Sequence, residues 1–303
     1  MLLITHPECL EHQMQPGHME RPERLAHLLS HFETTGLLQS LTVQVAPLVN
    51  RDLVKRIHTP TYVDGLSKAS PVTGLVRVDP DTAMCARSLN AADRAVGAVV
   101  EATRQVMSGQ HDRAFCAIRP PGHHAETAAA MGFCFYNSVC VAARYALDEL
   151  GAKHIAILDF DVHHGNGSVE IMQSEPRALV CSSFQSPFYP GRFDQGQWPN
   201  VVLTPLEEGT EGSEFRRLIE AEWIEPIRAH RPDLILISAG FDAHRADPLG
   251  GINLDVEDFS WITRLIVDLA KESCGGRVVS ALEGGYDLNA LALCAAAHVE
   301  VLK

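Results

Sequence analysis

Three side chains that can bind a metal ion alternate along the stretch Leu158–Gly167, which reads LDFDVHHGNG: Asp159, Asp161 and His163. The stretch continues an apolar, strand-like run at 154–158. Because side chains on a strand alternate between its two faces, the three residues are expected to point the same way. Open α/β sheets bind ligands at the carboxyl ends of their strands. Asp161 and His163 therefore offer an oxygen and a nitrogen to a metal ion, although a lone motif of this kind also fits a solvated strand end.

Three more loops rich in polar residues follow strand-like runs, at 119–137, 239–250 and 283–287. In a parallel sheet such loops open at the same edge, so that their side chains can meet those of the first loop. Asp242 then completes a set of three ligands with the aspartate and the histidine described above. Three protein ligands leave a position for water and substrate, as in catalytic zinc sites. Two carboxylates and one imidazole also suit Fe²⁺, Co²⁺ or Mn²⁺, and Asp242 alone would be interpreted as a turn residue.

The adjacent residues His123 and His124 follow Pro-Pro-Gly in the loop 119–137, which makes a stiff and sharply turned approach. They are candidates for metal ligands, for a proton-transfer pair or for loop residues without a special role. Asp159 and Asn166 lie in the first loop, and each can accept a ring N–H and so fix the tautomer and orientation of an imidazole. The two histidines are therefore candidates for proton transfer beside the metal.

Tyr286 follows Gly284 and Gly285, and it can bring a phenol O–H close to a bound carbonyl. A tyrosine in a glycine-rich loop more often serves packing, but this one ends the fourth of the converging loops. A metal ion, two histidines and a phenol together suggest hydrolysis of an amide or ester. The chain has no G-x-S-x-G motif, no Walker loop and no G-x-G-x-x-G after a strand, so neither a serine nucleophile nor a nucleotide site is expected.

The elements that must position these residues alternate between strand and helix patterns. Strands are predicted at 1–6, 43–49, 114–118, 154–158, 178–183, 201–203, 234–238 and 277–282. Helices are predicted around 25–32, in short pieces over 52–66 broken at Pro60, at 83–107, 138–150, from about 168, at 213–229 and 256–271, and at the end of the chain. Repeated βα units indicate a mostly parallel sheet with helices on both faces. One α/β domain over 1–303 is the simplest interpretation.

The composition is that of an ordinary globular protein, with 303 residues of which 46% are hydrophobic and 21% charged. The net charge of −13 argues against a nucleic-acid surface and is compatible with a cationic substrate. No apolar run approaches the ~20 residues of a membrane span, and the first residues resemble a strand rather than a signal peptide. A cytoplasmic location is therefore expected. The eight scattered cysteines are interpreted as buried thiols, not as a disulfide framework.

Taken as a set, five stretches resemble the zinc-dependent histone deacetylase family, in its bacterial, class II-like branch of histone deacetylase-like amidohydrolases. These stretches span nearly the whole chain, in family order and spacing: 17–24, 119–137, 159–167, 240–251 and 283–287. The resemblance implies an arginase-like fold, a single α/β domain around a parallel eight-stranded sheet. It agrees with the fold predicted from the alternating strand and helix patterns.

The resemblance also implies a role for individual residues. The zinc ligands would be Asp161, His163 and Asp242, with the paired histidines His123 and His124 and the carbonyl-polarising Tyr286 around them. Phe133, beside Gly132, would form one wall of an acyl-lysine tunnel, and Tyr189 would stand near the other wall, where family members usually carry Phe. A structural potassium ion would be bound by Asp159, the main-chain carbonyls of Asp161 and His163, and Ser182. Arg24 matches a position that lines an internal channel in some members.

Two comparisons refine the resemblance. Asn166 stands where class I enzymes carry Asp and class II enzymes carry Asn, which supports the class II-like branch. Arginases hold two manganese ions with extra carboxylates two residues beyond the equivalents of the histidine and second aspartate ligands. Those positions are Gly165 and His244 here, so a binuclear site is not expected.

Three functions follow as hypotheses. The first is a zinc-dependent deacylase (with Fe²⁺ or Co²⁺ as alternatives) that acts on acyl-lysine in proteins or peptides. The second is deacetylation of small acetylated amines such as acetylpolyamines, but relatives with that activity tend to carry loop insertions that this compact chain lacks. The third is a catalytically weak protein that binds acyl groups, against which the intact set of candidate catalytic residues argues. The oligomeric state is left open.

Overall fold

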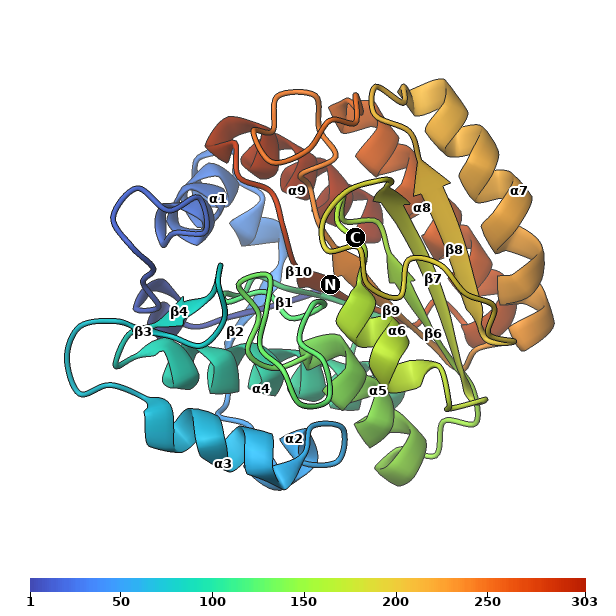
Figure 1. The fold of residues 1–303 in the computed structure, drawn as a ribbon. Coiled ribbons are helices and arrows are strands. Elements are labelled where there is room, and N and C mark those ends of the chain that lie inside the picture. Colours follow the sequence, from blue (N-terminus) through green and yellow to red (C-terminus); the bar gives the residue numbers. More distant parts are fainter.

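Eight parallel strands form the centre of the protein (Figure 1). The computed structural model describes residues 1–303. The strands are β1 (Leu2–Thr5), β2 (Thr42–Val45), β5 (Arg113–Cys116), β6 (Ile155–Asp159), β7 (Ala178–Gln185), β8 (Val201–Leu206), β9 (Leu234–Ala239) and β10 (Val278–Leu282). Their order across the sheet is β2-β1-β5-β10-β9-β6-β7-β8, and every neighbouring pair is parallel. All residues of the central strands β6, β9 and β10 are buried, as expected for strands covered on both faces.

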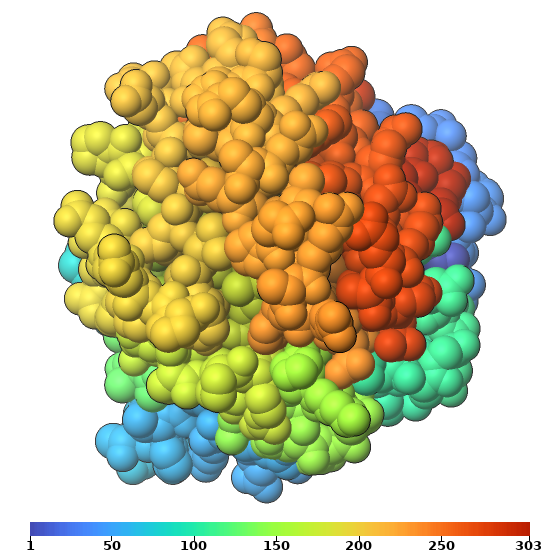
Figure 2. Space-filling view, turned by 90° about the vertical axis from the view of Figure 1, so that its right-hand side faces the viewer, coloured from blue at the N-terminus to red at the C-terminus, as the bar shows by residue number.

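Helices cover both faces of the sheet (Figure 1). On one side lie α2 (Arg51–Val54), α3 (Pro60–Ala69), α4 (Ser88–Met107), α5 (Ser138–Glu149) and α6 (Asn166–Met172). On the other side lie α1 (Glu23–Thr34), α7 (Gly212–His230), α8 (Val256–Cys274) and α9 (Leu288–Leu302). Figure 2 shows that α7 and the segments after it form most of the face of the molecule seen there, in gold to red. No helix combines the length and the hydropathy needed to cross a membrane.

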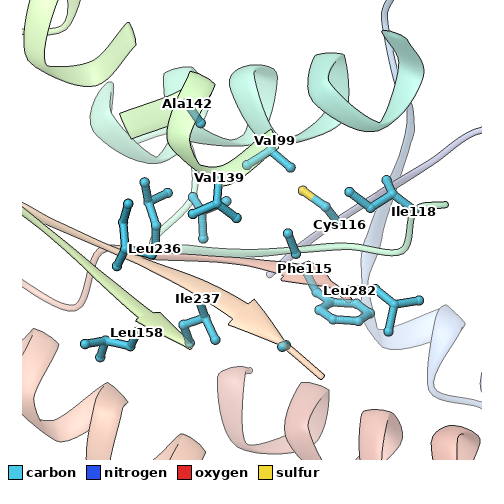
Figure 3. Packing of buried hydrophobic residues seen from close by; sticks show 14 of the residues in the cluster. Val99, Phe115, Cys116, Ile118, Val139, Ala142, Leu158, Leu236, Ile237 and Leu282 are labelled. Atoms are coloured by element: carbon cyan, nitrogen blue, oxygen red, sulfur yellow. The ribbon is translucent and has the colours of Figure 1, made fainter. Parts of the chain in front are cut away.

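The core consists of two apolar layers, one on each face of the sheet. Figure 3 shows Val99 of α4 and Val139 of α5 on one side, near Leu236 of β9, whereas Ile237 and Leu158 point to the opposite side. All of these side chains are buried. Consecutive residues of one strand pack into opposite layers, so each strand is held by close-packed side chains on both of its faces. The ends of the strands are therefore held in fixed positions.

Four adjacent strands position the candidate site. The order β5-β10-β9-β6 places the four polar loops predicted to meet at the carboxyl ends of neighbouring strands. The loop after β6 leads directly into the first turn of α6. The loop after β10 leads into α9, whose N-terminus is capped by the Asp287 side chain, which accepts a hydrogen bond from Ala290 N. The predicted fold class, an α/β protein with an eight-stranded parallel sheet flanked by helices, is confirmed.

The clearest difference between a predicted element and the structure is at the start of the long helix α4. The sequence predicts a helix over 83–107, but the helix α4 starts at Ser88, and residues 83–84 form a short strand, β4 (Ala83–Met84), that pairs with β3 (Val76–Arg77). The tip of this hairpin is held by the site itself: Asp81 Oδ1 accepts a hydrogen bond from Gly132 N, and Thr82 Oγ1 accepts one from Phe133 N. Tertiary contacts thus outweigh the local helix preference of 83–87.

Candidate active site

Asp161, His163 and Asp242 form a buried cluster at the ends of β6 and β9. Their ligand atoms all lie within 4.8 Å of one another, and His163 Nδ1 lies 3.1 Å from an oxygen of Asp161 and 3.2 Å from Asp242 Oδ2. Four ligands at zinc–ligand distances near 2.0 Å are separated by about 3.3 Å in a tetrahedron, which matches these separations. The three residues predicted to bind a metal ion are therefore brought together.

The polar surroundings of the cluster favour a cation. Asp242 Oδ2 is buried and accepts no hydrogen bond, whereas Asp242 Oδ1 accepts one from Val162 N at 2.8 Å. Burial opposes the charged form of His163, but the carboxylates of Asp161 and Asp242 outweigh it and raise the His163 pKa to about 10. The Asp242 oxygen without a donor and the negative field of the two carboxylates at His163 both indicate that a cation fits between these residues.

A glycine leaves the room that the cluster needs. Gly284 N donates a hydrogen bond to Asp161 Oδ2 at 2.8 Å. A Cβ atom at position 284 would lie 1.9 Å from Asp242 Oδ2 and 2.5 Å from Asp161 Oδ2. Only glycine therefore allows the loop after β10 to approach both carboxylates.

The two adjacent histidines have different hydrogen-bond partners. His123 Nδ1 donates to Asp159 Oδ2 at 2.9 Å, and His124 Nδ1 lies 2.7 Å from Asn166 Oδ1. Burial opposes the charged form of His123, but the carboxylates of Asp159 and Asp161 outweigh it and hold the His123 pKa well above its usual value. Burial, followed by the positive charges of His123 and His163, holds the His124 pKa well below its usual value. These surroundings favour the imidazolium form of His123 and the neutral form of His124.

Tyr286 is fixed by contacts that leave its hydroxyl free of protein partners. Its backbone N–H donates to Asp247 Oδ2 at 2.6 Å, and its ring lies beneath the guanidinium of Arg24, 4.7 Å from ring centroid to Cζ. Arg24 also donates to the carbonyls of Gly285 and Glu283. Burial raises the Tyr286 pKa well above its usual value, so the phenol keeps its proton and can donate it in a hydrogen bond.

A pocket of about 500 Å³ ends at these residues. His124, His163 and Tyr286 line it together with the aromatic residues Phe133, Phe188 and Tyr189. The Phe133 ring meets Tyr286 edge-on at 6.0 Å between centroids. Two acidic residues, Asp81 and Glu208, also line the pocket, and no Lys or Arg does.

The second aromatic wall has two members rather than the single one predicted. The Tyr189 ring meets the His124 ring edge-on, with 5.3 Å between centroids. Phe188, which the sequence analysis did not single out, stacks on the His163 ring at 5.4 Å with 19° between the planes. Its place next to Tyr189, in a segment after a strand, was the only available signal.

Gly132 acts as a spacer at the base of the opposite wall. It has a positive φ of 56°, and a Cβ atom there would lie 2.2 Å from Cδ2 of His124. The glycine lets the Gly132–Phe133 turn lie directly against the ring of His124, and both residues line the pocket.

The two residues predicted to bind potassium through their side chains, Asp159 and Ser182, lie on two neighbouring strands. Ser182 of β7 is the register partner of Asp159 of β6, but its Oγ lies 2.9 Å from His164 Nδ1. Asp159 Oδ1 accepts from Asp161 N, and Oδ2 accepts from His123. Each of these side-chain oxygens therefore has one protein partner and keeps a further lone pair that a cation can use.

Two buried carboxylates that the sequence did not single out hold the catalytic loops. Glu283 Oε2 accepts hydrogen bonds from the backbone N–H groups of Gly122 and His123, at 2.6 and 3.2 Å. Asp247 Oδ2 accepts from Tyr286 N and Asp287 N. Burial is the main cause that raises the pKa of each carboxyl to about 7. Both residues lie in the motifs quoted above, but a sequence cannot show which backbone groups a buried carboxylate will meet.

Comparisons with known proteins agree with this geometry. A model of the histone deacetylase domain matches residues 18–302. A probable deacetylase of Archaeoglobus fulgidus is 34% identical over 94% of this chain and 81% of its own length. A histone deacetylase-like amidohydrolase of Pseudomonas aeruginosa is 31% identical over 94% of this chain and 77% of its own length.

A solved structure gives the same result. The crystal structure of the HDA15 HD domain superimposes with a TM-score of 0.93 at 31% sequence identity, covering 99% of this chain and 87% of that one. The matched family domain, these relatives and the common fold lead to one conclusion: the chain belongs to the histone deacetylase family and is a deacetylase-type amidohydrolase.

Proposed function

We propose that this protein is a zinc-dependent deacylase that removes acetyl or other acyl groups from lysine side chains of proteins or peptides. The observation that carries the proposal is the convergence of the Asp161–His163–Asp242 cluster, the two histidines and Tyr286 at the end of one aromatic pocket. An extended acyl-lysine chain fits such a pocket, since its methylene groups are apolar and its amide ends at the polar cluster.

Asp161, His163 and Asp242 would hold the metal ion through two carboxylate oxygens and a ring nitrogen. When bound, Zn²⁺ supplies a Lewis acid and lowers the pKa of water; Fe²⁺ or Co²⁺ suits the same ligands. We also propose a structural potassium ion near Asp159, bound with main-chain carbonyls of the same loop and Ser182.

The chain's own residues carry the proton transfers. Neutral His124 accepts a proton from the attacking water, because its low pKa leaves the ring neutral and the contact of Nδ1 with Asn166 Oδ1 leaves Nε2 free to accept. Tyr286 donates a hydrogen bond to the oxyanion that develops on the substrate carbonyl. His123 remains protonated beside Asp159 and stabilises the negative charge. The proton held by His124 then passes to the leaving amine.

The lining of the pocket favours an amine-bearing substrate. Asp81 and Glu208 are the acidic members, and no Lys or Arg lines the pocket, so a positively charged segment around the acylated amine is attracted. Acetylpolyamines share this chemistry and remain the alternative substrate. The test is one preparation assayed with acetyl-lysine peptides, acetylpolyamines and small esters. Preference for the peptides supports the proposal, preference for acetylpolyamines supports the alternative, and binding without turnover indicates a weak acyl-binding protein.

Substitution of Phe133 by Ala is expected to separate long from short substrates. The ring forms one wall of the pocket and packs edge-on against Tyr286. The variant should weaken binding of acetyl-lysine peptides, raising KM, more than binding of small activated esters, which need less of the channel. Equal losses with both substrates, together with a lower melting temperature, would instead show general destabilisation.

Substitution of Asn166 by Asp is expected to shift the pH dependence of catalysis. A carboxylate would replace the amide oxygen 2.7 Å from His124 Nδ1, and its negative charge would raise the His124 pKa by about one unit or more. A base with a higher pKa stays protonated, and thus inactive, up to higher pH, so the acid limb of the kcat/KM profile should move upward. The profile is measured on wild type and variant with equal metal content; an unmoved limb would contradict the role of His124 as the titrating base.

A further inference from the structure

Glu126 and Arg192 form an ion pair that reaches from the surface to the candidate active site. Arg192 donates through Nε to Glu126 Oε1 at 2.8 Å and through Nη2 to Oε2 at 2.7 Å. The Glu126 side chain is 8% exposed and that of Arg192 is 53% exposed. Neither residue has a role in the chemistry proposed above. Glu126, at the buried end of the pair, nevertheless contacts a residue of the candidate active site.

That contact runs through Asn166. Its Nδ2 lies 2.7 Å from Glu126 Oε1, and also 3.3 Å from both the carbonyl oxygen of His124 and Met131 Sδ. An ionised carboxylate can only accept hydrogen bonds, so the amide must turn its NH₂ group toward Glu126. The amide oxygen then faces His124 Nδ1, 2.7 Å away.

The orientation of this amide determines which nitrogen of His124 carries the proton. Because an amide oxygen cannot donate, His124 Nδ1 must do so, and Nε2 is left with its lone pair. We infer that Glu126, held by Arg192, is a positioning residue: it fixes the orientation of Asn166 and thereby the tautomer in which His124 can accept a proton. The inference rests on the proposed function only where it treats His124 as the base. The tautomer of His124 does not depend on the proposed function.

The same ion pair anchors a wall of the pocket. Arg192 follows Tyr189 by three residues in the segment 186–200, and the Tyr189 ring meets the ring of His124. The next residue, Phe193, accepts a hydrogen bond through its carbonyl from His164 Nε2 at 3.0 Å. The Glu126–Arg192 ion pair therefore contacts both the segment that carries Tyr189 and the amide that orients His124.

Glu126→Gln tests the inference, because glutamine is nearly isosteric but can donate as well as accept. The 2.7 Å contact with residue 126 then no longer selects one orientation of Asn166, and only the longer contacts of Nδ2, at 3.3 Å, still favour it. The expected result is a fall in kcat of about 10- to 100-fold, typical for residues that orient a catalytic group, with a smaller change in KM. In the background of Asn166→Ala the same substitution should cost almost nothing, since the residue through which Glu126 acts is gone. An equal loss in both backgrounds, or no loss in either, would overturn the inference.

A second readout needs no substrate. In protein with ¹⁵N-labelled histidine, long-range ¹H–¹⁵N spectra distinguish the two tautomers of His124. We expect the Nδ1–H tautomer alone in wild type and a mixture in Glu126→Gln; an Nε2–H tautomer in wild type, or the same single tautomer in both, would contradict the inference. If the tautomers behave as expected and acetyl-lysine is not hydrolysed, the proposed function fails and the positioning role stands.

Two variants complete the design. If Glu126→Gln does not fold, Arg192→Gln perturbs the pair from its exposed end, and its loss of kcat must likewise disappear with Asn166→Ala; a loss that persists there overturns the inference. The matched control is Glu214→Gln, which breaks a similar bidentate pair with Arg217 on the exposed surface of α7. Unchanged kcat and an unchanged tautomer in this control support the assignment, and a similar loss there contradicts it.

Discussion

Replacement of Tyr286 by Phe is expected to lower kcat about 100- to 1000-fold, the usual cost of losing one oxyanion donor. KM should change little, because in the proposed mechanism the hydroxyl acts on the transition state rather than on the bound substrate. The substitution removes only the oxygen atom. The backbone bond to Asp247, the packing against Phe133 and the contact with Arg24 are all compatible with a phenylalanine ring.

Steady-state kinetics with an acetyl-lysine peptide measure the effect, at a metal content verified to equal that of wild type. Tyr62→Phe is a suitable control, since its hydroxyl donates to the carbonyl of Phe135 and does not line the pocket. A loss confined to KM would make Tyr286 a binding residue, and an equal loss in the control would point to general damage.

Replacement of Asp242 by Asn is expected to abolish both metal binding and turnover. Asp242 Oδ1 accepts a hydrogen bond from Val162 N, and the amide oxygen of asparagine can preserve it, so the loop should keep its shape. The NH₂ group that replaces Oδ2 cannot bind a cation. Metal content should fall from about one ion per chain, the number that one set of three ligands holds, to almost none.

Metal analysis of the purified variant and its rate with an acetyl-lysine peptide check this prediction. Asp268→Asn serves as the control, because this aspartate forms an exposed pair with Lys271 on α8 and should lose neither metal nor activity. Full metal content with a wild-type rate in Asp242→Asn would show that the ligand assignment is wrong.

Much of the fold follows from the sequence because its strands are apolar on both faces. Runs such as Leu234–Ala239 fit only a strand covered by helices on both sides, and their alternation with amphipathic helices requires parallel pairing. The start of α4 was predicted wrongly, because residues 83–84 have helix-compatible types. Their pairing with 76–77, and the contacts of Asp81 and Thr82 with the site, are long-range effects that local patterns do not contain.

The candidate site was predictable to the extent that its residues follow strand ends. Asp161, His163 and Asp242 do so, and the fold brings them together. The contacts that orient the site do not follow from this rule: Asp247 and Glu283 lie in two of the same loops, but each binds backbone N–H groups of a different loop. Such hydrogen-bond partners depend on how loops pack in three dimensions, and they cannot be predicted from residue type alone.

The central claim, metal-dependent hydrolysis of acyl-lysine, is tested most directly by reconstitution. Metal is removed with a chelator, the chelator is washed away, and Zn²⁺ is returned in steps while acetate released from an acetyl-lysine peptide is measured. The account predicts no release without metal and a rate that rises in proportion to bound zinc until about one ion per chain is bound. Acetate release that continues at the wild-type rate in the metal-free protein would contradict it.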